Sequence, residues 1–149
     1  MTVQRVPGGT RGRSTPPVLR RLLALVGRLS YRLGANRSKT LLLTTVGARS
    51  GRERTSAVAY FPDGDAAWLV VASMGGDRKH PAWYHNLVAN PGRASVQVAG
   101  RQVPVNARSL HGQERADRWA RIVATAPNFG KYQQVTDREI PVLRLEAAR

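Results

Sequence analysis

The sequence predicts a mainly β fold with flanking helices, an α+β domain built around a small barrel. Strand-like segments follow one another through short turns in the order β-β-β-α-β-β-α-β, without the regular strand–helix alternation that a parallel sheet requires. The chain has 149 residues, 42% of them hydrophobic, which suits one domain with its own core and is too short for two ordinary ones. We therefore expect a single antiparallel barrel with helices outside it.

The segments before the barrel are basic. Residues 1–15 combine glycines with scattered arginines and predict a disordered basic arm. Residues 16–38 predict an amphipathic helix and a linker, with Pro16 and Pro17 at the helix start and Gly34 as its stop. The leucines of this helix recur at helical spacing, and arginines fill much of the rest. Such a helix can pack on its own domain, the simpler interpretation, or lie on a membrane surface. If the helix bordered a lipophilic substrate pocket, it could pack on its own domain and also contact a membrane surface.

From residue 39 the pattern changes to strands, so residues 39–149 form the predicted barrel domain. The expected strands, each ending at a turn, are residues 41–46, 55–61, 67–73, 95–99, 102–107 and 140–145. Helices are expected over residues 81–89 and 113–125. The second helix is expected to carry Ala116, Trp119, Ala120 and Val123 on one face. Phe129 and Tyr132 follow the helix-breaking Pro127, in an expected loop that could line a pocket.

Composition limits the classes of function. The absence of cysteine rules out disulfides, thiolate metal sites and cysteine nucleophiles. No histidine spacing indicates a metal site, and we interpret His80 as a loop residue and His85 as a solvated helix residue. There is neither a secretory signal nor a run of about 18 apolar residues, so we expect a cytoplasmic protein.

The net charge of +15 makes nucleic-acid binding an alternative function. The first 52 residues hold eleven lysines and arginines and no acidic residue. However, aromatic residues do not alternate with basic ones in any segment, as stacking platforms for single strands would require. Much of the charge can be a solvated basic surface.

Two segments suit a flat molecule with an anionic tail. The turn over residues 47–54, here called the arginine turn, offers backbone N–H groups and the side chains of Arg49, Arg52 and Arg54. Taken alone, it is more simply an ordinary basic hairpin. The loop over residues 71–76 is rich in small residues that let a ring approach the backbone. No nucleophile–base pair or carboxylate pair is evident, which favours chemistry carried by a bound cofactor.

The helix after this loop has two interpretations. Trp83, Tyr84 and Leu87 are most simply its buried face, and the amide of Asn86 can bond either a heterocycle or a neighbouring strand.

Four groups of residues, in order over residues 41–143, resemble the deazaflavin-dependent nitroreductase family of actinobacteria. They are Leu42–Thr45 with Gly47–Gly51 and Arg54; Val71–Ser73 with Gly75 and Gly76; Pro81–Leu87 with Ala89–Pro91; and Tyr132, Gln133, Thr136–Arg138, Ile140 and Pro141. The resemblance implies a split β-barrel, flavin-reductase-like fold that binds coenzyme F-420, an 8-hydroxy-5-deazaflavin with a phosphate and an oligoglutamate tail. It implies hydride transfer from the reduced cofactor to a quinone, nitro compound or activated double bond.

The resemblance also implies roles for particular residues. The cofactor-binding residues would be Arg49, Ser50, Gly51, Arg54, Thr55, Ala72, Ser73, Met74, Gly75, Ala82, Trp83, Tyr84 and Asn86. Phe129 and Tyr132 would bind the acceptor, with Tyr132 or water supplying any proton. Met74 stands where relatives can have lysine. Ala126 and Phe129 replace tyrosines of the nitroimidazole-activating member, which argues against that activity here.

The resemblance also implies partners for this protein, and one alternative interpretation of its ligand stays open. The expected acceptor is lipophilic, with peripheral membrane contact through residues 16–34 at the inner face of the cell membrane, and the chain could form a homodimer. A rival interpretation keeps the fold but uses FMN, or binds a deazaflavin or haem-like ligand without turnover.

Overall fold

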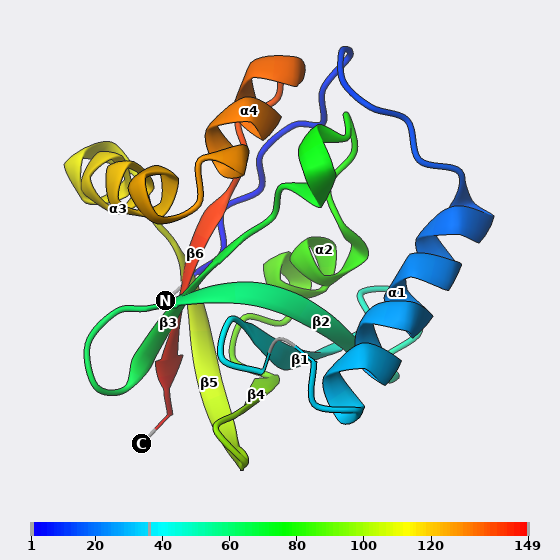
Figure 1. Cartoon of the computed structure of the whole chain (residues 1–149), viewed down its shortest axis with the longest axis vertical. Helices are drawn as coiled ribbons and strands as arrows, with labels where there is room; N and C mark the ends of the chain where they lie inside the picture. Colours follow the sequence, from blue (N-terminus) through cyan, green and yellow to red (C-terminus); the bar gives the residue numbers. More distant parts are fainter. Residues whose placement is uncertain (1, 36, 149) are drawn as a thin grey trace.

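Six antiparallel strands close into a barrel in the computed structural model, which describes residues 2–35 and 37–148. The strands pair in the order β1-β2-β3-β6-β5-β4, and the helices lie outside them (Figure 1). Their bounds are β1 (Thr40–Val46), β2 (Glu53–Pro62), β3 (Ala67–Val71), β4 (Ala94–Val98), β5 (Arg101–Ser109) and β6 (Val142–Ala147). The expected mainly β barrel is confirmed, with strand ends shifted by at most two residues.

Alternation along the strands builds the barrel core. Leu41 and Leu43 of β1 are fully buried, and Leu43 pairs with buried Val96 of β4. Helix α2 (Ala82–Ala89) adds Trp83, Tyr84 and Leu87 to the same core cluster. Because one face of the helix is committed to the core, α2 is held firmly against the barrel.

Two helices cover a second cluster on the outside of β3 and β6. They are α3 (Gly112–Thr125) and α4 (Asn128–Val135). Of the face expected on α3, Trp119 packs against this cluster and Val123 is half-buried, whereas Ala116 and Ala120 are exposed. The fully buried residue of the helix is Ile122, which was not part of the expected face. The expected loop at Phe129 is wrong, since this residue lies in α4.

The error about α4 has a simple physical reason. Pro127 ends α3, but it also caps the start of α4, with φ at −59°. Proline is tolerated there because the first N–H groups of a helix need no intrahelical partner.

The N-terminal arm is ordered along the barrel, which corrects the expected disorder. In Figure 1 it runs from the barrel past α4 and the short helix η1 (Met74–Gly76) to α1. The backbone N–H of Gly9 donates to Arg78 O at 2.7 Å, and Val3 is buried. Asp137 accepts hydrogen bonds from Thr10 and from the N–H of Arg11. Composition alone missed this because backbone bonds, rather than apolar side chains, hold most of the arm.

Helix α1 (Pro17–Arg32) lies on the barrel through its less apolar face. Gly27 lies against Ala57 of β2, Arg28 donates to Thr55 O at 3.2 Å, and Tyr31 donates to Gln97 O at 3.1 Å. The apolar side chains that remain exposed are Val18, Leu19, Leu22, Leu23, Leu25, Val26, Leu29 and, just after the helix, Leu33. At about 100° per residue they centre on the side of α1 opposite the barrel.

Helix α1 therefore packs on its own domain, as the simpler interpretation expects, but its apolar side chains face away from the barrel. We call the set of exposed side chains on α1 and Leu33 the outer apolar face. Among the described residues, no helix combines the length and the hydropathy that a membrane crossing needs.

One carboxylate fastens α3 to the barrel. Asp63, in the turn between β2 and β3, bonds Arg118 at 3.0 Å, Arg121 at 2.8 Å and Arg144 at 2.8 Å. Burial opposes the charged form of Asp63, but the hydrogen bonds from these arginines outweigh it and lower its pKa to about 2. The ionised carboxylate is thus the shared counter-charge of three guanidinium groups.

Replacing Asp63 should show how much its ionised carboxylate contributes to stability, because that contribution depends on pH. The folded pKa of about 2 lies below the ordinary 3.8, so the stabilisation is present above pH 3.8 and is lost as the pH falls toward 2. Asp63→Asn should lower the unfolding free energy at pH 7 by at least about 2 kcal/mol and remove that part of the acid dependence. Urea unfolding at several pH values measures both, with the exposed neighbour Asp65→Asn as control. If acidification lowered the unfolding free energy equally in the parent and in Asp63→Asn, the account would be contradicted.

Candidate cofactor site

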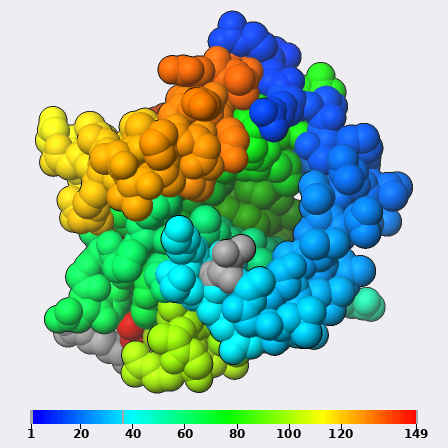
Figure 2. Space-filling view, in the orientation of Figure 1, coloured from blue at the N-terminus to red at the C-terminus, as the bar shows by residue number. Residues whose placement is uncertain are grey.

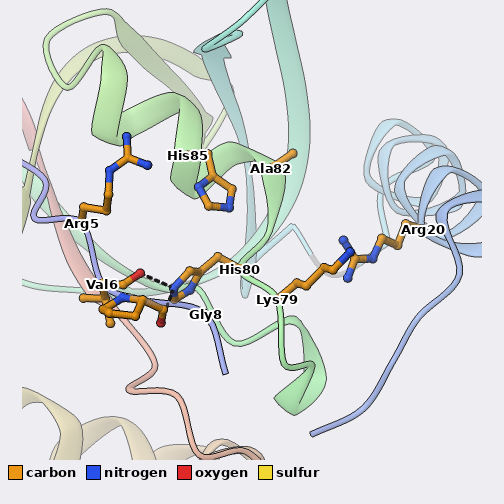
Figure 3. A pocket seen from close by; sticks show the side chains of 9 residues that line it. Arg5, Val6, Gly8, Arg20, Lys79, His80, Ala82 and His85 are labelled. Carbon is orange, nitrogen blue, oxygen red and sulfur yellow. Dashed lines mark hydrogen bonds between the residues drawn. The ribbon is translucent and has the colours of Figure 1, made fainter. Parts of the chain in front are cut away.

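A cavity of about 590 Å³ opens between the arm, α1 and the start of α2. On the face seen in Figure 2, the surface is hollowed between blue α1 and the green segment that carries η1 and α2. The residues that line the cavity, shown in Figure 3, are Arg5, Val6, Pro7, Gly8, Arg20, Lys79, His80, Ala82 and His85. Only Ala82 belongs to the predicted cofactor site, so the cavity extends beyond the residues that sequence reasoning selected.

A buried guanidinium fixes the loop beside this cavity. Arg138 is 2% exposed and donates to three backbone carbonyls, those of Ala72 at 3.0 Å, Ser73 at 2.7 Å and Asp77 at 2.7 Å. Loop carbonyls that would otherwise be buried without partners are thereby satisfied. Arg138 belonged to the quoted resemblance but had no assigned role, because nothing in the sequence distinguishes a buried arginine from the many exposed ones.

The loop itself is tightly turned. Met74, Gly75 and Gly76 have φ values of +45°, +63° and +84°, all left-handed. A side chain at Gly76 would start only 2.3 Å from Val135 Cγ2 and 2.9 Å from Tyr132 O, so glycine is required where the loop meets α4. The small-residue loop predicted from the sequence thus has a packing reason for at least one glycine.

His80 connects the buried guanidinium to the arm. Arg138 lies 3.1 Å from Nδ1 of His80, and a guanidinium can only donate, so Nδ1 accepts and Nε2 carries the proton. Nε2 donates to Val6 O at 2.8 Å. Burial lowers the pKa of His80, and the charge of Arg138 adds to this effect despite opposing hydrogen bonds. His80 lies in a loop as expected, but it is a buried neutral link.

The fold uses the side chains of several predicted cofactor residues. The hydroxyl of fully buried Tyr84 donates to Gln4 O at 2.6 Å and accepts from the N–H of Val6 at 2.9 Å, so it anchors the arm. Trp83 packs in the barrel core, and the backbone N–H of fully buried Ala72 donates to Pro141 O. Trp83 and Tyr84 are thus buried, as the simpler interpretation of this helix expects. The anchoring of the arm by Tyr84 and the backbone bond of Ala72 are roles that the sequence analysis did not assign.

Asn86 joins α2 to the arginine turn. Its Oδ1 accepts from the N–H of Ala48 at 2.9 Å, and its Nδ2 donates to Thr45 Oγ1 at 3.0 Å. The sequence analysis allowed this amide to bond either a heterocycle or a neighbouring strand. The structure shows bonds to the strand and to the turn that follows it. The contact fixes the position of the turn relative to the first residues of α2.

The arginine turn presents its polar groups to solvent. Arg49, Ser50, Gly51 and Arg54 are all exposed, and Gly51 has a left-handed φ of +68°. Thr55 is half-buried, with its hydroxyl 2.9 Å from that of Thr44. The turn therefore keeps its guanidinium groups available to an anion.

His85 stands between this turn and the arm. Burial lowers its pKa, and the positive charges of Arg5 and Arg49 lower it further. His85 is thus close enough to Arg5, which lines the cavity, and to Arg49 of the arginine turn for both charges to act on it. Its expected place on the solvated side of α2 is observed.

The predicted acceptor residues lie together on α4. The ring of Phe129 meets Phe61 edge-on at 5.7 Å and Tyr132 at 5.5 Å. The hydroxyl of Tyr132 accepts from Asn128 Nδ2 at 3.1 Å. Neither Phe129 nor Tyr132 lines the 590 Å³ cavity, although the backbone of Tyr132 touches the η1 loop at Gly76.

This closed barrel with outer helices is the split barrel of flavin-reductase-like proteins. A FAD-binding protein of Mesorhizobium loti, 15% identical with a TM-score of 0.54, shares the fold alone. The sequence matches the family described as F420H(2)-dependent quinone reductase over residues 8–147. The chain belongs to this family, and the predicted resemblance to deazaflavin-dependent reductases is confirmed.

Individual relatives agree with the family match. The F420H(2)-dependent quinone reductase Rv1261c of Mycobacterium tuberculosis is 41% identical over 123 residues, 80% of this chain and 80% of that protein. The solved F420-H2 dependent reductase FDR-A of Mycobacterium smegmatis is 41% identical, with a TM-score of 0.65 over 72% of this chain and 94% of its own. A structure described as a domain-swapped dimer is 35% identical, with a TM-score of 0.68 over 87% and 96% of the two chains.

Removing the Arg138 guanidinium should loosen the loop and the arm together. Arg138→Met leaves three carbonyls and the Nδ1 of His80 without their donor, and should lower the unfolding free energy by at least about 3 kcal/mol. Hydrogen exchange should accelerate at residues 8–13 and 73–79. Arg101→Met, at an exposed turn, is the control and should change stability by less than about 0.5 kcal/mol. Equal urea midpoints for both variants would contradict the role of Arg138.

Proposed function

We propose that the protein is a reductase that uses reduced coenzyme F-420 to reduce a lipophilic quinone. The observation that carries the proposal is the match over residues 8–147 to a family described by that cofactor and that acceptor class. Relatives 41% identical to this chain carry the same description. Nitroimidazole reduction is not part of the proposal, because Ala126 and Phe129 stand where the activating member has tyrosines.

The residues fit the cofactor expected for this family. The exposed guanidinium groups of Arg49 and Arg54 suit a phosphate or carboxylate tail, and bidentate contacts of this kind are strong. Ala82 is exposed and Met74 and Gly75 are half-buried, and none of them carries a bulky polar group, so a flat ring can lie beside them; Ser73 itself is buried. Asn86 holds the turn in register with α2, so the tail and ring contacts keep a fixed spacing.

The chain's own residues bind and orient the cofactor and the acceptor, and they supply protons. Reduced coenzyme F-420, when bound, supplies the hydride. The fixed loop at residues 72–77 keeps the ring-facing backbone from moving, since its carbonyls are committed to Arg138. Tyr132 or a water molecule supplies a proton to the acceptor oxygen, on which negative charge grows as hydride arrives.

The arginine turn can be tested by binding. Arg49→Ala and Arg54→Ala should each weaken F-420 binding by about 1.5–3 kcal/mol, the cost of a lost charged hydrogen bond. Thermal stability of the free protein should stay almost unchanged, because both side chains are exposed. Arg101→Ala removes the same charge at another exposed turn and serves as control. If both variants bind as the parent does, the tail lies elsewhere.

The proton donor can be tested by turnover. Tyr132→Phe keeps the ring and should slow single-turnover oxidation of reduced F-420 by a quinone about ten- to a thousand-fold. Cofactor affinity should stay within about twofold. Tyr60→Phe, on a half-buried tyrosine of β2, is the matched control. An unchanged rate would leave Tyr132 a packing residue, whereas lost binding with normal chemistry would assign it to the cofactor wall.

The outer apolar face of α1 suggests where a lipophilic acceptor is found. Leu22, Val26 and Leu29 are about half exposed, at 53%, 50% and 47%, and arginines flank them. Apolar residues beside cations suit the surface of an anionic membrane. We therefore propose that the enzyme is cytoplasmic and makes peripheral contact with the inner face of the cell membrane through residues 16–34.

Vesicle binding tests this contact. A triple variant, Leu22→Gln, Val26→Gln and Leu29→Gln, should bind anionic phospholipid vesicles at least about tenfold more weakly, since each buried side chain contributes about 1.5–3 kcal/mol. Its folding stability should not fall, because these side chains are exposed in the folded chain. Ala116→Gln with Ala120→Gln, on exposed positions of α3, is the control. Unchanged vesicle binding would contradict the contact, and conversion of a dimer into monomers would reassign the face to a homodimer.

A further inference from the structure

One side chain on the wall of the 590 Å³ cavity is free to exchange a proton. His85 lines the cavity from α2 and is exposed, and no hydrogen bond to another described residue holds its imidazole. The other imidazole of the wall, that of His80, is buried with both ring nitrogens engaged by Val6 O and Arg138. Because histidine is the side chain that ordinarily titrates closest to neutral pH, His85 is the group of this wall that can give and take protons.

The position of His85 suits a role beside the ring of the cofactor. It lies one helical turn after Ala82, the residue beside which the flat ring is proposed to lie. Residues three apart on a helix share a face, and both of these side chains line the cavity. In Figure 3 the imidazole extends from α2 into the space between Arg5, Ala82 and His80. His85 is therefore the ionisable side chain that α2 places beside the proposed ring position.

Tyr132, the proton donor that the family resemblance implies, is placed differently. It does not line the cavity, and its hydroxyl accepts a hydrogen bond from Asn128 Nδ2 at 3.1 Å. The other proton source in the proposed function is a water molecule. Such a water needs a new proton after each transfer, and a titratable side chain on the cavity wall can supply it.

In the free protein, His85 is mostly neutral at pH 7. Burial lowers its pKa below the ordinary 6.5, and the positive charges of Arg5 on the arm and Arg49 in the arginine turn lower it further. The rings of His80 and Tyr84 lie 5.7 and 5.6 Å away. Burial lowers the pKa of His80 and raises the pKa of Tyr84, so both of these neighbours are uncharged.

The other charged groups of the cavity wall are also cations. They are Arg20 from α1 and Lys79 from the loop before α2, and no acid lines the cavity within the described part of the chain. The carboxylate of Asp77 is fully buried and pairs with Arg20 at 3.2 Å. An anionic ligand therefore opposes the positive field around His85. Since a nearby negative charge favours the imidazolium, such a ligand raises the pKa of His85.

We propose that His85 is a proton donor in the reduction of the quinone. The inference rests on the proposed function and names the group that resupplies its water. Reduced F-420, when bound, supplies the hydride, which brings both electrons to the quinone. The imidazolium of His85 gives one proton, directly or through one water, to the oxygen on which negative charge grows, so the quinone becomes a hydroquinone. The neutral imidazole then takes a proton from solvent.

The first test follows the imidazole itself and needs no turnover. The chain has three histidines, so NMR can follow their Cε1–H resonances separately. His85→Gln and His111→Gln assign two of them, and His111 is an exposed histidine outside the cavity. Oxidised F-420 should raise the titration midpoint of His85 by about one pH unit and leave that of His111 in place. The 8-hydroxy-5-deazaflavin ring without phosphate and tail should not raise it.

The second test measures proton transfer. In single-turnover oxidation of reduced F-420 by a quinone, the rate of the parent should fall as the pH rises through the midpoint of bound His85, because the imidazolium is the donor. His85→Gln keeps a polar side chain that cannot ionise. At saturating cofactor it should be at least about tenfold slower at pH 6 and should lack this fall. His111→Gln should follow the parent, and all three proteins should share one urea midpoint, since both side chains are exposed.

The proposal is overturned if F-420 leaves the titration midpoint of His85 unchanged or lowers it. It is equally overturned if His85→Gln keeps the rate and the pH dependence of the parent. A parent that binds no F-420 contradicts the proposed function and this inference with it. Binding and turnover to which His85 contributes nothing contradict this inference alone.

Discussion

The buried guanidinium of Arg138 belongs to a network that ties together three segments around the cavity. It bonds the carbonyls of the 72–77 loop directly, and through His80 it reaches Val6 of the arm. Asp77, which lies in this loop, is tied in turn to Arg20 of α1. One network of charged and polar groups therefore sets the distances between loop, arm and first helix. The cavity exists because these segments are fixed around it.

Charge distribution explains why a strongly basic chain keeps a few cations free for ligands. Asp63 alone engages three arginines, and Glu114 bonds Arg108 at 2.7 Å, so much of the positive charge on the α3 side is structural. The first 52 residues have no acid of their own. The arginine turn and the arm therefore keep exposed positive charge available to a ligand. This arrangement fits an anionic cofactor better than nucleic acid, which would need a contiguous basic stripe.

The barrel was predictable from sequence because strand alternation and turn residues are local signals. Features that depend on contacts between distant segments were not. The arm at residues 2–15 is ordered by backbone bonds to Gly76, Arg78 and Asp137, which composition does not reveal. Tyr84 was selected as a ligand residue although its hydroxyl holds that arm. The arginine turn could be found because three arginines around a glycine are visible locally. The cations of the cavity come from three separate segments and could not be found in this way.

Direct comparison of cofactors tests the central claim, that this basic split barrel is built for a deazaflavin with a polyanionic tail. Purified protein should be titrated with oxidised F-420 and, separately, with FMN at physiological salt, following the fluorescence of each ligand. The account predicts tighter binding of F-420, with an affinity that weakens as salt is raised, because exposed charge contacts are screened. Equal or tighter binding of FMN would contradict it.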